Sequence, residues 1–282
     1  MCKAGAPGYF AGKKNMNWNV FLLCLLLSFS AAAQETIPFQ FTPNHTAMLV
    51  RVKVPGFPGK HYMQFDLGSP HTLLYRNKLP GVTDTLHNHS LLIHKTRFTP
   101  QHIPVIDAGH SGPIIGTLGA DFISNKVVVF DYPRRRLIIS DSIPKKYQTT
   151  LYPFHFMAGR VLLPAKIANQ STILFFDTGS SAYSLITDSA TAISLAIPGA
   201  APDNTPVNSW GRTLTAHNLP SADSVIIAGR SLPLHKVTWM SGASDAQVQQ
   251  MKRVGIGSMT GNRLFLGRVL VVDVRNRRFG IR

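Results

Sequence analysis

The sequence is poor in cysteine. Its 282 residues include only Cys2 and Cys24, both close to the N-terminus. If this leading segment is removed, the remaining chain has no thiol, which excludes cysteine nucleophiles, thiolate metal sites and disulfides. The sequence also lacks the His-Glu-x-x-His motif of zinc peptidases and the Gly-x-Ser-x-Gly elbow of serine hydrolases. Catalysis by this chain would therefore depend on carboxylates, hydroxyls or imidazoles.

Acidic residues are scarce as well. There are 13 Asp and Glu residues against 29 Lys and Arg, and the formal net charge is +16. The only tight basic runs, at 133–137 and 275–278, follow apolar stretches and are typical of turns. A nucleic-acid-binding protein is expected to have a basic stripe with aromatic platforms or a known module, and neither is found. The sequence predicts no nucleic-acid partner but a solvated basic surface suited to an anionic envelope; a polyanion-binding function would rest on charge alone.

The first 33 residues have the pattern of a secretory signal peptide. Lys13 and Lys14 form a basic segment, residues 20–29 form an apolar run, and residues 30–34 ("SAAAQ") form a small-residue cleavage site. An apolar run of about ten residues is too short to span a bilayer. We therefore expect cleavage after Ala33, no stable membrane insertion afterwards, and a secreted, periplasmic or envelope-associated protein. An uncleaved N-terminal anchor is the alternative.

Glycine and proline, by contrast, are frequent, with 22 and 19 residues spread along the chain. Short apolar or alternating stretches bounded by Gly, Pro, Asn and Asp are typical of strands joined by turns. We expect strands at 224–229 and 235–239 among others, whereas the best helix candidates are 189–196 and 245–254. The sequence thus predicts an all-β fold with a few short helices.

One acidic residue stands in an unusual place. The stretch "TILFFDTGSS" (172–181) places Asp177 directly after four apolar residues, where a buried carboxylate is costly unless it is paired, hydrogen-bonded or protonated. The stretch "HYMQFDLGSPHTLLY" (61–75) aligns with 172–186 and sets Asp66 against Asp177. Each copy predicts a strand, an Asp-x-Gly-Ser turn and a second strand, with Gly where backbone amides approach the carboxylate. Asp66 is therefore the candidate partner of Asp177.

The internal repeat extends beyond these turns. The stretch "NKVVVFDYPRRRLIIS" (125–140) aligns with "GRVLVVDVRNRRFGIR" (267–282), and each is an apolar strand, an Asp, a basic turn and a closing strand. Further strands precede each Asp-x-Gly-Ser turn, at 48–54 and 160–167. The stretches 113–123 and 254–266, which precede 125–140 and 267–282, match as well. Four features repeated in the same order indicate a duplication. Because only two copies occur, we expect two lobes, at 34–146 and 147–282, rather than a solenoid.

These residues resemble the pepsin/retropepsin superfamily of aspartic peptidases, and the resemblance covers about residues 45–282. The family carries Asp-Thr-Gly in each of two related lobes, followed by an apolar-apolar-Gly element. The two turns are matched here by Asp177-Thr178-Gly179-Ser180-Ser181 and Asp66-Leu67-Gly68-Ser69. The apolar element is matched by Ile114-Ile115-Gly116 and, loosely, by Gly255-Ile256-Gly257. The segment from Gly116 to Ile139 is especially similar to bacterial retropepsin-type domains.

The resemblance implies a two-lobed, acid-protease-type β-barrel fold with an internal pseudo-twofold duplication. It also implies a monomeric aspartic-type endopeptidase that hydrolyses peptide bonds in a peptide or protein substrate bound in the interlobe cleft, with no cofactor and no metal. Asp66 and Asp177 would be the catalytic residues, one charged and one protonated, acting on a water molecule. The residues that would support the two turns are Gly68, Ser69, Thr178, Gly179 and Ser180.

Two departures from the family pattern keep a second function open. Leu67 replaces the Thr whose hydroxyl ties the two turns together in the family. The family also covers its site with a hairpin from the first lobe, and the candidate segment here, 86–105, has neither the Tyr nor the Gly typical of it. The four histidines of this segment follow no compact metal-ligand spacing. The alternative to an enzyme is therefore a catalytically degenerate peptidase-like protein that binds peptides in the interlobe cleft.

Overall fold

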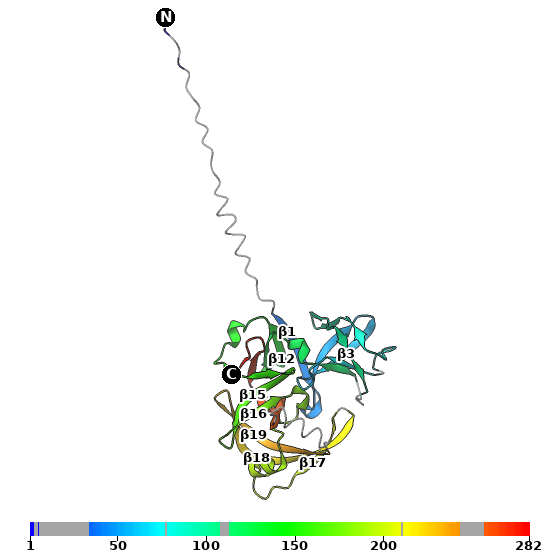
Figure 1. The fold of residues 1–282 in the computed structure, drawn as a ribbon, viewed down its shortest axis with the longest axis vertical. Helices are drawn as coiled ribbons and strands as arrows, with labels where there is room; N and C mark the ends of the chain where they lie inside the picture. The colour runs from blue at the N-terminus through cyan, green and yellow to red at the C-terminus, as the bar shows by residue number, and fades with distance from the viewer. Residues whose placement is uncertain (3–4, 6–33, 77, 108–112, 210, 243–256) are drawn as a thin grey trace. The chain divides into compact units, whose positions relative to one another are not determined.

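The described strands and helices all lie in residues 34–282 (Figure 1). The structure, a computed structural model, describes residues 1–2, 5, 34–76, 78–107, 113–209, 211–242 and 257–282. The chain divides into two units, Met1–Ala33 and Gln34–Arg282. The helix expected at 245–254 lies outside the described residues. Within the described part of the chain, no helix is long and apolar enough to cross a membrane.

The fold is all-β with short helices, as the sequence predicted. The strands of the first lobe are β1 (Glu35–Phe41), β2 (Met48–Val54), β3 (Phe57–Phe65), β4 (Leu73–Tyr75), β5 (Leu86–His87), β6 (Leu91–Ile93), β7 (Thr96–Phe98), β8 (His102–Ile103), β9 (Val105–Ile106), β10 (Ile114–Leu118), β11 (Val127–Asp131) and β12 (Arg136–Ser140). Those of the second lobe are β13 (Tyr152–Pro153), β14 (His155–Met157), β15 (Arg160–Ile167), β16 (Gln170–Phe176), β17 (Asp203–Ser209), β18 (Arg212–Ile227), β19 (Arg230–Ser241), β20 (Ser258–Thr260), β21 (Val269–Asp273) and β22 (Arg278–Ile281). The predicted boundary between residues 146 and 147 lies in the connection between β12 and β13, and its position stays a prediction.

The helices are short. The expected helix at 189–196 is found as α2 (Ser189–Leu195), where the Asp188 carboxylate caps the first turn by accepting a 2.9 Å hydrogen bond from the Thr191 amide. The 3₁₀ turns are η1 (Pro43–His45), η2 (Ala120–Ile123), η3 (Tyr132–Arg134), η4 (Lys145–Tyr147), η5 (Thr178–Ser180) and η6 (Asn262–Phe265). The strand candidate at 224–229 covers the end of the much longer strand β18 and the turn after it, and the candidate at 235–239 lies within the long strand β19.

One sheet joins the two lobes. Its strand order is β13-β22-β21-β11-β12-β1-β2-β3-β10-β4-β9, and the first six of these are three strands of each lobe. Where the two lobes meet, β11 and β21 pair in antiparallel fashion, with Val129 opposite Val271. Both of these residues are fully buried, and β-branched side chains suit strands that are covered on both faces. The equivalent strands of the repeat therefore meet across a pseudo-twofold axis.

The register of the inner strands corrects one part of the sequence alignment. β10 runs parallel to β3 with Leu118 opposite Phe65, and β20 runs parallel to β16 with Thr260 opposite Phe176. The equivalent glycines are therefore those that follow, Gly119 and Gly261, and not Gly116 and Gly257 as the apolar-apolar-Gly match suggested. A side chain at Gly119 would lie 2.4 Å from the backbone of the segment after the Asp66 turn, and one at Gly261 would lie 1.9 Å from that of the Asp177 turn. Close backbone contact explains both glycines.

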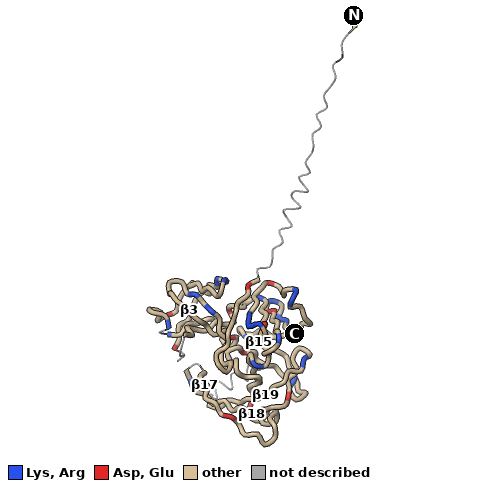
Figure 2. Tube along the Cα trace, turned by 180° about the vertical axis from the view of Figure 1, so that it is seen from behind, with Lys and Arg blue, Asp and Glu red and all other residues tan. Residues whose placement is uncertain are grey.

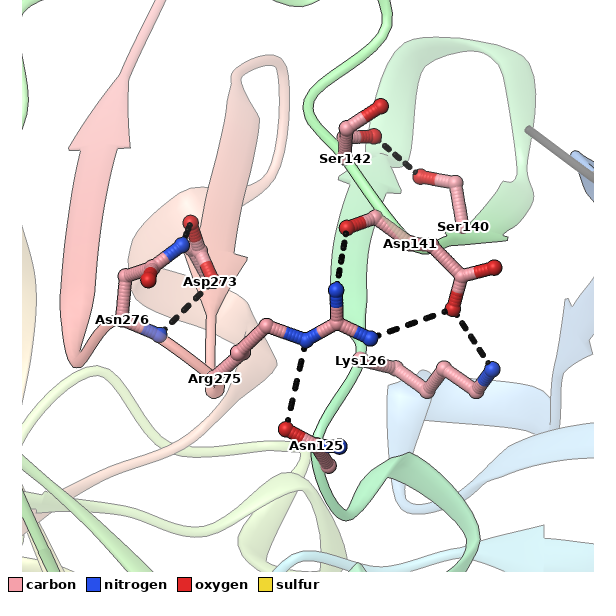
Figure 3. Close-up of polar contacts among 8 residues, drawn as sticks. All are labelled: Asn125, Lys126, Ser140, Asp141, Ser142, Asp273, Arg275 and Asn276. Atoms are coloured by element: carbon pink, nitrogen blue, oxygen red, sulfur yellow. Dashed lines mark hydrogen bonds and ion pairs between the residues drawn. The ribbon is translucent and has the colours of Figure 1, made fainter. Parts of the chain in front are cut away.

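The two aspartates that end β11 and β21 hold their turns together. Buried Asp131 accepts hydrogen bonds from Arg136 (3.1 Å) and Tyr147 (2.9 Å). Its counterpart Asp273 accepts two bonds from Asn276, of 3.0 and 2.8 Å (Figure 3). These contacts give both aspartates a structural role in their turns.

The β21–β22 turn also reaches the first lobe. The Arg275 guanidinium donates to Asn125 (3.2 Å) and to the carbonyl and carboxylate of Asp141 (3.3 and 3.4 Å), and Lys126 binds the same carboxylate at 2.7 Å (Figure 3). Because all four groups are exposed or half-exposed, these ion pairs orient the turn more than they stabilise the fold. Lys and Arg residues are otherwise distributed over both lobes (Figure 2). The absence of a nucleic-acid partner stays a prediction.

Candidate active site

The two sequence-predicted aspartates occupy equivalent positions at the ends of equivalent strands. Asp66 follows β3, and its amide donates to Leu118 O at 3.0 Å. Asp177 follows β16, and its amide donates to Thr260 O at 2.9 Å. Each Asp is thus anchored by the parallel neighbour of its own strand, and the turn that follows is free to direct the carboxylate out of the sheet.

An aromatic layer lies beneath both turns. Phe65 and Phe176, the residues before the two aspartates, are fully buried, and Phe130 of the shared sheet lies between them. Its ring centroid is 6.0 Å from that of Phe65 and 5.6 Å from that of Phe176. Edge-on and tilted contacts of this kind add to the apolar area that the rings bury. Apolar packing therefore links the two halves of the site.

The turns bring the two carboxylates together. Gly68 N donates to Asp66 Oδ1 and Gly179 N donates to Asp177 Oδ1, both at 2.8 Å. A Cβ atom at Gly68 would lie 2.5 Å from Asp177 Oδ1, and one at Gly179 would lie 2.5 Å from Asp66 Oδ1. Each glycine therefore faces the carboxylate of the opposite turn, and any larger residue would push the pair apart.

The carboxylate of Asp66 has a strongly perturbed pKa. Asp66 is only 7% exposed, and this burial raises the pKa of its carboxyl group well above the usual 3.8. The charge of Asp177 and a side-chain hydrogen bond to Asp177 raise it further, whereas the amides of Gly68 and Ser69 lower it. Two adjacent carboxylates cannot both ionise easily, and this favours the protonated form of Asp66.

The two serines of the turns act differently. Ser180 Oγ donates to Asp177 Oδ2 at 2.8 Å and also lies 3.3 Å from Met259 Sδ, as expected of a turn residue that supports its own Asp. Ser69 Oγ donates instead to His71 O at 2.7 Å. Asp177 therefore receives a hydroxyl hydrogen bond that Asp66 lacks.

Thr178 ties the two turns together in one direction. Its hydroxyl accepts from Leu67 N at 2.9 Å and donates to Phe65 O at 2.8 Å. Gln64 adds a 3.4 Å contact from its side-chain amide to Gly179 O. Leu67 is fully buried in the main apolar core and provides no return hydroxyl. Of the two hydroxyl links that the family pattern predicts between the turns, the one made by Thr178 is therefore present. Apolar packing of Leu67 replaces the other.

A buried polar network behind the Asp177 turn escaped the sequence analysis. The Asn262 amide donates to Thr178 O and Ser181 Oγ, both at 3.0 Å, and its oxygen accepts from Tyr132 OH at 2.7 Å. Tyr132 follows β11 of the first lobe, so the network crosses between lobes. Asn262 follows the repeat glycine Gly261, where the first copy has Ala120, and this break in the repeat was the only available signal.

Tyr75 is a second residue that sequence reasoning missed. Its hydroxyl lies 2.7 Å from Thr117 Oγ1, and both residues are buried. Burial raises the pKa of Tyr75 to about 12, the hydrogen bond with Thr117 lowers it, and the charge of Asp66 contributes a further rise. Tyr75 therefore lies within electrostatic reach of the carboxylate pair.

The segment 86–105 does not form a free covering hairpin. β6 pairs with β2 (Ile93 opposite Val52), and β5 pairs with β8. Leu91, Ile93 and Ile103 are fully buried, because these apolar side chains add to the first-lobe core rather than extend over the site. No group of three His, Cys, Asp or Glu side chains able to hold a metal is found in the part of the chain that the structure describes.

Comparison with known proteins places this geometry in a familiar fold. No family model matches the sequence, and no curated protein matches it. Among solved structures, the chain is similar to the aspartic proteinase from Irpex lacteus, with a TM-score of 0.57 and 16% sequence identity over 88% of this chain and 97% of that one. The protein therefore has the two-lobed, pepsin-like acid-protease fold. The likeness does not distinguish the bacterial retropepsin-like form that the sequence suggested.

Proposed function

We propose that the protein is an aspartic endopeptidase that hydrolyses peptide bonds in the interlobe cleft, with Asp66 and Asp177 as its catalytic pair. The observation that supports this is the contact between the two carboxylates, held by matched turns whose glycines each face the opposite carboxylate. A carboxyl group buried beside a second one is unlike a carboxylate on a surface turn and is typical of sites that need one neutral and one charged carboxyl group.

The surroundings of the two residues assign them different roles. Asp66 is the more buried, and its raised pKa makes it the group that holds the proton. Asp177 is partly exposed and accepts hydrogen bonds from Gly179 and Ser180, which stabilise a carboxylate. Asp177 would take a proton from water as the water oxygen attacks the peptide carbonyl carbon. Asp66 would give its proton to the carbonyl oxygen. The C–N bond then breaks as Asp177 gives the proton that it took to the amine nitrogen, and Asp66 takes a proton back from a hydroxyl of the diol intermediate.

Digestion of an unfolded protein tests this proposal. We expect purified protein to cleave reduced, alkylated casein between acid and neutral pH, pepstatin to suppress the cleavage, and EDTA to leave it unchanged. Cleavage that survives pepstatin but not EDTA would assign the activity to a metallopeptidase instead.

The second candidate function is that of a binding protein without catalysis. It is favoured by Leu67, which is fully buried and provides no hydroxyl to the Asp177 turn. A shift of the carboxylates by about 1 Å is costly in rate while leaving a peptide-binding surface intact. Peptide binding without cleavage at any pH would support this candidate.

We also propose that residues 1–33 are a signal peptide and that the mature monomer is secreted, periplasmic or envelope-associated. The boundary between the two units of the chain falls between Ala33 and Gln34, which agrees with the predicted cleavage site. Intact mass spectrometry of the native protein should give a chain that starts at Gln34 and contains no thiol. A native protein that retains residues 1–33 would contradict the cleavage.

A further inference from the structure

The second lobe carries a long hairpin that the sequence did not indicate. β17 and β18 pair without interruption from Asp203 opposite Asn218 to Ser209 opposite Arg212. Within the described residues β17 pairs only with β18, so its other edge is unpaired there, and most of its residues are exposed. In Figure 1 this hairpin (yellow) extends from its sheet towards the part of the fold that contains β3.

The pseudo-twofold shows where this hairpin was added. In the first lobe, β4 lies between β9 (parallel) and β10 (antiparallel). In the second, Ile186 makes a parallel bridge with Thr238 and an antiparallel bridge with Met259, so it is the counterpart of β4. From these points the first lobe returns to its sheet through 76–91, and the second through 187–224. The hairpin lies in this longer return, at the position where the first lobe has only a short connection.

The tip of the hairpin reaches the first lobe. Gly211 has a φ of +81°, and a Cβ atom on it would lie 3.9 Å from Asp107 O. The turn is closed by a 2.9 Å hydrogen bond from Gly211 N to Asn208 Oδ1. Asp107 in turn accepts a 2.9 Å hydrogen bond from Arg76 Nε, which holds the contacted segment beside β4. The hairpin thus extends from one lobe to the other.

The point of contact is on the side of the carboxylate pair. Asp107 follows β9, whose Ile106 pairs with Tyr75. The Tyr75 hydroxyl contacts Thr117, and Thr117 lies opposite Gln64 in the parallel pair β10–β3. Gln64 also donates a 3.4 Å hydrogen bond from its side-chain amide to Gly179 O, so its side chain leaves β3 on the face of the Asp177 turn. This face carries the site, and the hairpin tip meets the edge of the same sheet.

The base of the hairpin is stiff. The ring of His217 stacks on that of Trp239, with 4.6 Å between the ring centroids. Its nitrogens lie 2.7 Å from Asn204 Oδ1 and 2.8 Å from Ser241 Oγ, so one side chain connects β17, β18 and β19. Such an arm is expected to move about its base as a unit rather than to unravel.

We propose that the β17–β18 hairpin is the arm that closes over an extended polypeptide bound at Asp66 and Asp177. The cover then comes from the second lobe, opposite to the first-lobe hairpin expected from the family. The free edge of β17 offers unpaired backbone N–H and C=O groups to the substrate backbone, so this contact selects extended chains rather than particular side chains. The proposal rests on the proposed function, because it concerns what covers the same site.

A reversible lock tests the arm. In full-length protein with Cys2 and Cys24 replaced by Ser, the pair Asp107→Cys and Gly211→Cys is oxidised to a disulfide and then reduced. The matched control is Ser224→Cys with Ser231→Cys, whose hydroxyls lie 2.8 Å apart at the other end of β18. If Gly211→Cys does not fold, Arg212→Cys replaces it. A lobe-spanning pair that stays reduced while the control pair closes would contradict the contact itself.

The kinetic readout is cleavage of labelled, unfolded casein before and after reduction. We expect oxidation to lower the rate at least tenfold in the lobe-spanning pair, reduction to restore it, and neither treatment to change the control. If the oxidised protein cleaves casein at a rate within twofold of that of its reduced form, the proposal that the hairpin closes over the substrate is overturned.

Binding separates this outcome from failure of the proposed function. If even the parent protein cleaves nothing, the peptidase proposal fails, and binding of a fluorescent casein peptide then tests the arm alone. Binding to the reduced form that is lost on oxidation would support it. Equal binding to both forms, or binding to neither, would overturn it.

Discussion

At the scale of single residues, the two aspartates stand in different surroundings despite their matched turns. Asp177 accepts from the Gly179 amide and the Ser180 hydroxyl and is partly exposed. Asp66 is more buried, and Ser69 turns its hydroxyl away towards His71 O. Differences of this kind divide the work of a carboxylate pair, because the better-solvated member keeps the charge and the other keeps the proton.

This difference predicts that Asp66→Asn stabilises the protein at neutral pH. Because the pKa of Asp66 is raised in the fold, protonation of Asp66 stabilises the folded state, and this contribution is fully present below the usual pKa of 3.8. That contribution is lost as the pH rises through the value in the fold. Asn stays neutral and still donates to Asp177, so the melting temperature should exceed that of the wild type at pH 7 and equal it near pH 3.

Asp131→Asn is expected to shift the melting temperature at pH 7 in the opposite direction. Burial alone would raise the pKa of Asp131, but hydrogen bonds from Tyr147 and Arg136 and the charge of the arginines lower it overall. Its charged form therefore stabilises the fold above 3.8, and this stability is lost as the pH falls through the value in the fold. Asp131→Asn should lower the melting temperature at pH 7 and approach the wild type in acid. Two variants that shift in the same direction would contradict these assignments.

The hydroxyl of Thr178 provides the bracing that remains between the turns. Thr178→Val keeps the shape of the side chain but leaves Leu67 N and Phe65 O buried without this partner. We expect the free energy of unfolding to fall by about 1–3 kcal/mol and cleavage to weaken. Thr36→Val on β1, whose side chain makes no hydrogen bond within the described residues, is the control. A Thr178→Val protein as stable as this control would show that the hydroxyl does not brace the turns.

At the scale of elements, the shared sheet sets the distance between the two turns. β11 places Phe130 between the rings that precede the two aspartates, so a change in one strand reaches both halves of the site. Phe130→Ala removes the ring that both contact. It should lower the free energy of unfolding by about 3–5 kcal/mol, measured by urea denaturation.

Phe156→Ala on β14 is the matched control, because that ring is only half buried. Phe156→Ala should lower the free energy of unfolding much less than Phe130→Ala does, since less buried apolar area is lost. Equal losses for the two variants would mean that Phe130 has no special place in the core.

At the scale of the whole molecule, the duplication was readable from the sequence because strand length, turn residues and the two aspartates recur in one order. The alignment still erred at Gly116, because an apolar-apolar-Gly pattern fits several registers and only the pairing with β3 selects one. The contacts of Tyr75 with Thr117 and of Asn262 with Tyr132 join residues far apart in the chain and leave no local pattern. The hairpin was missed because β17 is polar, exposed and contains Pro206, so it lacks the alternation that indicates a strand.

The central claim is that Asp66 and Asp177 act as one catalytic pair. The most direct measurement is the initial rate of casein cleavage across the pH range for the wild type, Asp66→Asn and Asp177→Asn. Asp223→Asn is the control, because it changes an exposed aspartate of β18 that lies outside the pair. Neither carboxyl can perform both proton transfers, so each pair variant should lose at least a hundredfold in rate, while Asp223→Asn retains activity and both pair variants remain folded. Substantial turnover by either folded pair variant would contradict the account.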